Sequence, residues 1–240
     1  MRMRIAIGSI DFPELDDSLT SYYFINSNLA YNMFCIWKSF RLQSENCFES
    51  ERNRVRIRRR RSKQQECRLI KYNHVYKKVP VLVHNGNPVS ESIVIVEYVA
   101  DAWKGVPILP QDAYGKARAR FWAKFVDDKC IPAVFKAIGS HGQEQAVAES
   151  HEQLQFLENE LKGNKFFGGD NINLVDISAT FIAFWLGAAE EALGIKVLTK
   201  DKFPKLIKWS DNYINCQAVK DSLPPREILV AFFKMRFGGN

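Results

Sequence analysis

The chain has 240 residues, of which 46% are hydrophobic and 25% charged, proportions that are typical of a globular protein with its own core. Its longest uncharged apolar stretch, from Ile177 to Ala189, is too short to cross a bilayer as a helix, so we expect no membrane span. Acidic residues close to the N-terminus argue against a secretory leader. The five cysteines form no CxxC pair and the chain has only four histidines, so we expect free thiols, no metal site and a cytoplasmic protein.

The net charge of +7 is unevenly distributed along the chain. Residues 1–70 hold 13 Lys and Arg against 8 Asp and Glu, and 11 of these bases are Arg, whereas residues 71–240 hold 21 against 19 and use mainly Lys. Seven arginines fall between Arg52 and Arg61, a density that predicts a solvated or extended segment. Such a run suits phosphate contacts, but it lacks interleaved aromatic residues and a reading helix. We therefore expect no nucleic-acid partner.

The first half of the chain contains one clear β-hairpin. Arg4–Ile7 is a possible short strand, and the β-branched run Val79–Val83 predicts a second one. The dipeptide Asn85-Gly86 is the strongest short hairpin signal, and a return strand follows it. Ser90 is placed to cap a helix that continues to Trp103. The pattern predicts two strands that lead directly into a helix.

The second half is expected to be helical. Gly105–Asp112 contains two prolines and reads as a linker, after which Phe121 and Phe125 fall on one helical stripe that by default packs in a core. Asn173 and Asp176 have the spacing of a capping box, and the apolar helix that follows should be buried. His141 and His151 show no partner pattern and are expected at the surface.

Several segments in order resemble plant tau-class glutathione transferases. They are Tyr76–Gly86, Ser90–Ser92, Trp103–Pro110, Ala117–Phe125, Asn173–Ile177, Phe203–Leu206 and Leu223–Arg226. Each segment alone is a weak signal, but their order and spacing together are specific to that family. The resemblance covers residues from about 72 to the end of the chain.

This resemblance implies an α/β plus all-α protein, with a thioredoxin-like N-terminal domain followed by an all-helical C-terminal domain. We expect an atypical, Arg-rich and partly disordered segment over residues 1–70, a β-β-α half of the thioredoxin-like domain over 71–104, a linker over 105–112 and the helical domain over 113–240. Because residues 1–70 carry no family motif, the N-terminal domain is expected to be incomplete or aberrant. Two kinds of event would explain why residues 1–70 lack the family's motifs. One is an error at the gene level, namely a misjoined exon, a frame shift or an intron read through, and the other is a long insertion.

The resemblance also implies a function and a set of residues. Members of the family conjugate the thiol of glutathione to small hydrophobic electrophiles, act in detoxification and stress response, bind glutathione as co-substrate without a resident cofactor or metal, and are homodimers. Val79 would pair with the cysteinyl backbone of glutathione, while Glu91 and Ser92 would hold its γ-glutamyl end. The candidate residues for the electrophile pocket, whose aromatic members are by default core residues, are Phe121, Phe125, Phe135, Lys136 and Trp185.

The family's activating serine has no counterpart motif in residues 1–70. In the family this hydroxyl hydrogen-bonds the glutathione sulfur and favours the thiolate. Ser9 follows the possible first strand and is the only stand-in, which requires the Arg-rich run to be an insertion. The alternative function is therefore a glutathione-transferase-like protein that binds ligands without catalysis.

Overall fold

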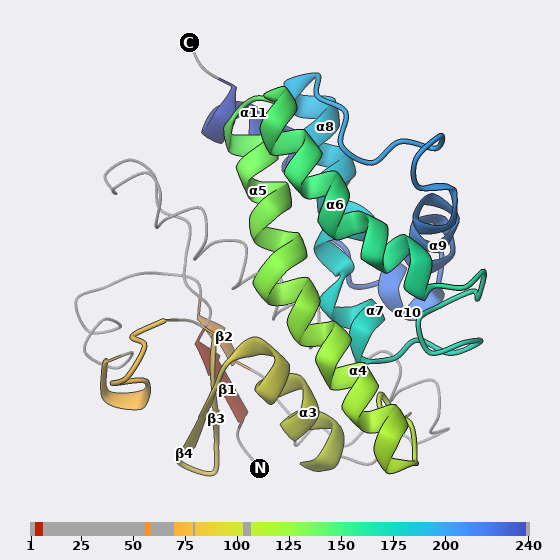
Figure 1. The fold of residues 1–240 in the computed structure, drawn as a ribbon. Coiled ribbons are helices and arrows are strands. Elements are labelled where there is room, and N and C mark those ends of the chain that lie inside the picture. The colour runs from red at the N-terminus through yellow and green to blue at the C-terminus, as the bar shows by residue number, and fades with distance from the viewer. Residues whose placement is uncertain (1–2, 7–55, 59–69, 79, 103–106, 239–240) are drawn as a thin grey trace. The chain divides into compact units, whose positions relative to one another are not determined.

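The computed structural model describes residues 3–6, 56–58, 70–78, 80–102 and 107–238. The chain divides into two compact units, residues 1–106 and residues 107–240, and each is described here by itself. Figure 1 shows the strands in the first unit and the helical second unit.

The first unit contains a four-stranded sheet in the order β2-β1-β3-β4. Its strands are β1 (Met3–Ala6), β2 (Arg56–Arg58), β3 (Val81–His84) and β4 (Asn87–Ser90). β1 pairs in parallel with β2 and antiparallel with β3, which in turn pairs antiparallel with β4. The predicted strand near Arg4 is confirmed, and part of the Arg-rich run is extended as β2. Residues 1–70 thus supply two of the four described strands of this sheet.

The β3–β4 hairpin forms as its turn residues predict. Asn85 and Gly86 both adopt positive φ angles, 51° and 85°, which are the requirement of a two-residue type I′ turn. His84 pairs with Asn87 across this turn. Val81 and Leu82 are fully buried because β3 lies inside the sheet, between β1 and β4.

The helix after the hairpin, α3 (Ser92–Ala102), begins later than the sequence suggests. Ser90 is the last residue of β4, and its predicted role as helix cap is wrong. The carbonyl of Glu91 accepts the first intrahelical bond, from the amide of Ile95 at 2.8 Å, so Glu91 occupies the N-cap position. The reason is that the β4 ladder continues through Ser90, which pairs with Val81.

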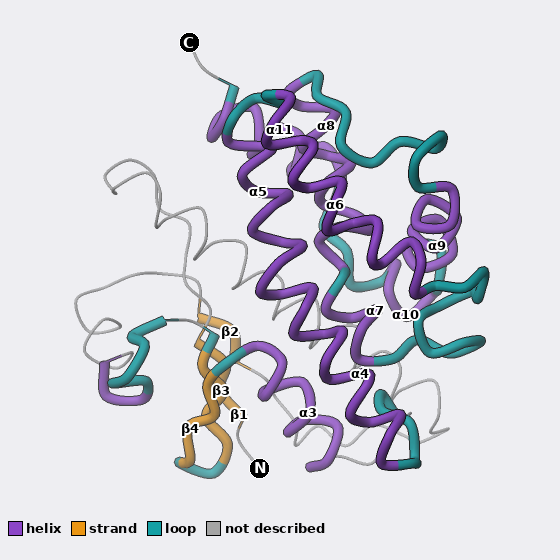
Figure 2. Tube along the Cα trace, in the orientation of Figure 1, coloured by secondary structure: helices purple, strands orange, loops and turns teal. Residues whose placement is uncertain are grey.

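The second unit is helical throughout its regular structure (Figure 2). Its elements are α4 (Ala113–Phe125), η1 (Val126–Cys130), α5 (Ile131–Gly139), α6 (Glu144–Glu160), α7 (Leu174–Ser178), η2 (Phe181–Trp185), α8 (Leu186–Leu193), α9 (Pro204–Ile214), α10 (Gln217–Lys220) and α11 (Arg226–Phe237). Two of these, η1 and η2, are single π-helical turns: η1 joins α4 to α5, and η2 leads into α8. Helix α5 packs along α6, and α8 packs along α11.

The core of the second unit is built around large aromatic side chains. Those with almost no solvent exposure are Phe181, Phe203, Trp209, Tyr213 and Phe233. The predicted central apolar segment is buried as expected, although it is divided into α7, η2 and α8. Within the part of the chain that the structure describes, no helix is long and apolar enough to span a membrane.

Helix α4 buries a different face from the one that the aromatic stripe predicts. Phe121 is 62% exposed, whereas Ala119 and Ala123 are buried on the face toward the core. The prediction that Phe121 belongs to the core is wrong. Small alanine side chains let α4 approach α7 closely, and this close packing leaves the aromatic rings on other faces.

Candidate functional site

The structure describes some of the site residues predicted from the sequence, and others lie outside the described part of the chain. Val79 and Ser9 lie outside the described residues, as does the segment in which a serine motif would fall. Pro80, which follows Val79, is buried and leads into β3. Glu91 and Ser92 lie together at the junction between β4 and α3. The described part of the site is therefore this junction.

The junction has the features of an anion-binding corner. Glu91 has a φ angle of +73°, a left-handed conformation that is uncommon for a residue with a side chain. Ser92 is the first residue of α3 and is 8% exposed. Its hydroxyl makes no hydrogen bond with any residue that the structure describes. The first-turn amides of a helix lack intrahelical acceptors, so they and the Ser92 hydroxyl are available to a carboxylate, while the Glu91 carboxylate suits an ammonium.

A turn built on Asn73 precedes Val79, and sequence reasoning missed it. Asn73 is 5% exposed, and its side-chain Nδ2 donates to the carbonyl of Lys78 at 2.8 Å. The amide of Lys77, which has a φ angle of +54°, donates to the carbonyl of Asn73 at 2.9 Å. This side chain fixes the backbone immediately before Val79. Asparagine's preference for turns was the available signal, because its side chain readily bonds nearby backbone groups.

The aromatic candidates for an electrophile pocket fall into two groups. Phe121 and Phe125 belong to a row of rings that runs from α4 to α6. Phe121 meets Trp122 with ring centroids 5.3 Å apart, Trp122 meets Phe125 at 5.4 Å, and Phe125 meets Phe156 of α6 at 5.7 Å. Phe121 is 62% and Phe156 54% exposed. We call these four residues the aromatic row.

Phe135 and Trp185 form the second group, and both contact Phe181. The ring centroids of Phe135 and Phe181 lie 4.6 Å apart, and those of Phe181 and Trp185 lie 6.4 Å apart in a stacked arrangement. Trp185 is 2% exposed, which agrees with the default expectation that it is a core residue. Sequence spacing gave no sign of this division, because the contacts join α5 to η2.

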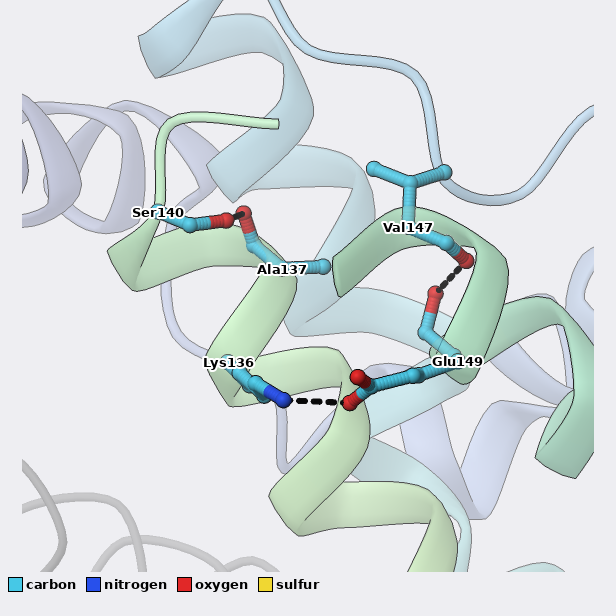
Figure 3. A network of polar contacts seen from close by, with 6 residues as sticks. Lys136, Ala137, Ser140, Val147 and Glu149 are labelled. Carbon is cyan, nitrogen blue, oxygen red and sulfur yellow. Dashed lines mark hydrogen bonds and ion pairs between the residues drawn. The ribbon is translucent and has the colours of Figure 1, made fainter. Parts of the chain in front are cut away.

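Lys136 is engaged in an ion pair across two helices. Its Nζ contacts the carboxylate of Glu149, which joins α5 to α6, as Figure 3 shows. The side chain of Lys136 is 60% exposed. A pair this exposed contributes little to stability, and it gives Lys136 a partner other than a substrate.

The thiol of Cys130 and the imidazole of His151 are two further reactive groups of the second unit, and their surroundings restrict what each can do. Burial raises the pKa of the Cys130 thiol, so this cysteine is not a thiolate nucleophile at neutral pH. His151 is not the isolated surface residue that the sequence predicts, since it bonds the carbonyl of Val197 at 2.9 Å and Nζ of Lys202 at 3.0 Å. The described residues contain no group of His, Cys, Asp and Glu that would hold a metal ion.

Comparison with known proteins identifies the family. The sequence model of the glutathione S-transferase N-terminal domain matches residues 45–101, and that of the C-terminal domain matches residues 121–216. A probable glutathione S-transferase of Glycine max is 53% identical over 172 residues, which span 70% of this chain and 76% of that protein. The chain belongs to the glutathione S-transferase family. The match to the N-terminal domain model begins at residue 45, whereas the motifs that reveal the resemblance in the sequence start only at about residue 72.

Further relatives place this glutathione S-transferase beside the tau class. Glutathione S-transferase U8 of Arabidopsis thaliana is 51% identical over 173 residues, which cover 71% of this chain and 77% of that protein. The crystal structure of a tau-class glutathione S-transferase from mango superimposes with a TM-score of 0.73, at 29% identity and 98% coverage of both chains. Rice GST1 in complex with glutathione superimposes with a TM-score of 0.70, at 26% identity, covering 97% of this chain and 96% of that one. These likenesses agree with the thioredoxin-like and helical domains of the fold.

Proposed function

We propose that this glutathione S-transferase conjugates the thiol of reduced glutathione to small hydrophobic electrophiles. The observation that carries the proposal is the Glu91–Ser92 junction, where Glu91 has a left-handed φ angle and the Ser92 hydroxyl lies beside the first-turn amides of α3. The γ-glutamyl carboxylate would bind the Ser92 hydroxyl and these amides, and its ammonium would bind the Glu91 carboxylate. The relative from rice that shares this fold was crystallised with glutathione. Detoxification in the cytoplasm is the role that the family resemblance implies.

The proposed reaction is a nucleophilic substitution at an electrophilic carbon. The thiol loses its proton to solvent, the sulfur forms a bond to carbon, and the leaving group departs with its bonding electrons. The protein's task is to bind glutathione with Val79, Glu91 and Ser92 and to favour the thiolate. Ser9 is the proposed source of the hydroxyl that would stabilise the thiolate.

The second candidate function is ligand binding without catalysis. The observation that favours it is the lack of the family's serine motif in residues 1–70. Such a protein would bind glutathione at the Glu91–Ser92 junction but would leave the pKa of the glutathione thiol unchanged. The two functions make the same prediction for binding and opposite predictions for turnover.

The test is conjugation of 1-chloro-2,4-dinitrobenzene by the purified full chain, together with retention on glutathione resin. Turnover above the uncatalysed rate supports the transferase, and Ser9→Ala should then reduce kcat. Ser92→Ala should raise KM for glutathione about tenfold, because it removes a hydrogen bond to a charged group. Ser140→Ala is the matched control, since Ser140 Oγ only bonds the carbonyl of Ala137 at the end of α5 (Figure 3). Retention without turnover supports the ligand-binding alternative, and neither retention nor turnover contradicts both functions.

We also propose that the protein is a homodimer in which the aromatic row is covered by the second copy. The family resemblance implies a dimer, and the row leaves Phe121 and Phe156 more than half exposed on adjoining helices. Large exposed aromatic groups are typical of protein interfaces. Sedimentation of Phe156→Glu should give a monomer, whereas Ile228→Glu, which changes an equally exposed apolar residue on α11, should stay dimeric. A monomeric wild-type protein would contradict this proposal. The aromatic row would then remain a candidate binding surface for the electrophile.

A further inference from the structure

A partly buried hydrogen bond joins the β-hairpin to α3. Nδ1 of His84 lies 2.7 Å from the hydroxyl of Tyr98, and the two rings meet edge to face with centroids 5.8 Å apart. His84 is the last residue of β3 and is 8% exposed. Because His84 pairs with Asn87, the bond ties α3 to the point where β4 starts.

The chain between these two anchors reverses through a strained residue. β4 ends at Ser90, Glu91 takes a φ angle of +73°, and α3 begins at Ser92. A non-glycine residue keeps a left-handed conformation only where its surroundings hold it there. The strand side of the reversal is held by the pairing of Ser90 with Val81. On the helix side, the hydrogen bond between His84 and Tyr98 ties α3 to the same hairpin.

We propose that the His84–Tyr98 hydrogen bond is a positioning contact that keeps Glu91 and Ser92 in the conformation that binds the γ-glutamyl end of glutathione. This inference rests on the proposed function of the same junction. Tyr98 lies six residues beyond Ser92, which is about 9 Å along the helix. Both residues therefore act through the junction, and neither is assigned a contact with the substrate.

The expected effect is on glutathione affinity and not on the chemical step. If the bond is lost, α3 keeps its fold but its first turn samples other orientations, and only a fraction of molecules bind glutathione. A neutral hydrogen bond of ordinary net strength corresponds to about a two- to tenfold loss in affinity. Once glutathione is saturating, every molecule is in the bound conformation, so kcat and the KM for the electrophile should not change.

The first experiment compares Tyr98→Phe, His84→Leu and their double mutant in the full chain. Each single substitution should raise the KM and the Kd for glutathione about two- to tenfold. In the double mutant the two effects should be less than multiplicative, because both single substitutions remove the same His84–Tyr98 bond. His84→Asn should restore most of the affinity, because the Asn side-chain amide occupies the position of Nδ1. Tyr72→Phe is the control, since its hydroxyl makes no hydrogen bond with any described residue. Unchanged glutathione affinity in Tyr98→Phe, or equal losses in kcat, would overturn the proposal.

The second experiment measures the junction without any ligand. The amide of Ile95 bonds the carbonyl of Glu91 at 2.8 Å, so its hydrogen exchange reports the order of the first turn of α3. Tyr98→Phe should speed this exchange about two- to tenfold, while the amide of Lys116, which bonds Asp112 at the start of α4, should not change. Unchanged exchange at Ile95 contradicts the positioning role. Faster exchange in a protein that does not bind glutathione would instead contradict the proposed function and leave the positioning contact in place.

Discussion

Trp209 donates its indole Nε1–H to Oδ1 of Asp176 at 2.8 Å, and both side chains are buried. The same carboxylate accepts the amide of Asn173 at 2.8 Å and the amide of Phe167 at 2.9 Å. One acidic group therefore connects the start of α7, the loop before it and α9. Burial raises the pKa of Asp176 to about 6, although these donors oppose the shift, so the group is ionised at neutral pH.

Replacing Asp176 should strongly destabilise the helical unit. Asp176→Ala leaves two buried donors and one partly buried donor without an acceptor, and we expect the free energy of unfolding to fall by about 3 to 5 kcal/mol. Urea denaturation at pH 7 measures this change. Asp170→Ala, which alters an exposed residue of the neighbouring loop, should change the value by less than about 0.5 kcal/mol. A similar small change for Asp176→Ala would contradict the role assigned to the carboxylate.

His151 should make stability depend on pH. Its neutral form donates from Nε2 to the carbonyl of Val197 and accepts at Nδ1 from Lys202. Burial lowers the pKa of His151, and the charge of Lys202 adds to this while Asp201 opposes it. Between the folded pKa and the ordinary value of about 6.5, the unfolded chain therefore binds more protons than the folded one, and stability falls as the pH drops below about 6.5.

Variants of this contact test the sign of the effect. In His151→Gln the titrating group is absent, so the variant should lose less stability than the wild type between pH 7 and pH 5. Lys202→Met removes the cation that faces Nδ1 and should also weaken the pH dependence. Unfolding free energies measured in urea at several pH values give the comparison. A steeper loss in His151→Gln than in the wild type would show that the sign is wrong.

Features that depend on neighbouring residues could be predicted from the sequence. The Asn85-Gly86 turn needs two positive φ angles, and these residue types supply them at little cost. The capping box of Asn173 and Asp176 is likewise set by a spacing of three residues, and both of its hydrogen bonds form. The buried apolar helix after it follows from composition alone.

Features that depend on distant partners could not be predicted. The loop residues that bond His151 lie 46 and 51 positions further along the chain. Strand β2 is fixed by pairing with β1 across a long intervening segment, whereas its own sequence, Arg-Ile-Arg, lies inside an Arg-rich run that gives no strand pattern. On α4, one aromatic stripe and one alanine stripe both have helical spacing, and only the packing of α7 decides which is buried.

Glu158 should be worth more to stability than its exposed neighbours on α6. It is 4% exposed, and its carboxylate accepts the amides of Lys205 at 3.0 Å and Leu206 at 2.8 Å. It thereby caps the first turn of α9 from another helix, where a negative charge also suits the helix dipole. Glu158→Ala should lower the free energy of unfolding by about 2 to 3 kcal/mol, and Glu158→Gln by about half as much. Exposed Glu152→Ala is the control in the same urea titration. Equal effects at the two positions would contradict the capping role.

The Asn73 turn should control glutathione binding through the backbone that precedes Val79. Asn73 Nδ2 holds the carbonyl of Lys78, so its loss should free this peptide and weaken the pairing that we propose between Val79 and glutathione. Asn73→Ala should raise KM for glutathione at least about threefold to tenfold, because it removes this hydrogen bond and also the one that Asn73 Oδ1 accepts from the amide of Tyr76 at 3.1 Å. Asn73→Asp has nearly the same shape but replaces the donor with an oxygen that repels the Lys78 carbonyl, so its effect should be at least as large. Initial-rate kinetics at varied glutathione measure both. If Asn73→Asp behaves like the wild type, the bond to Lys78 does not position the site.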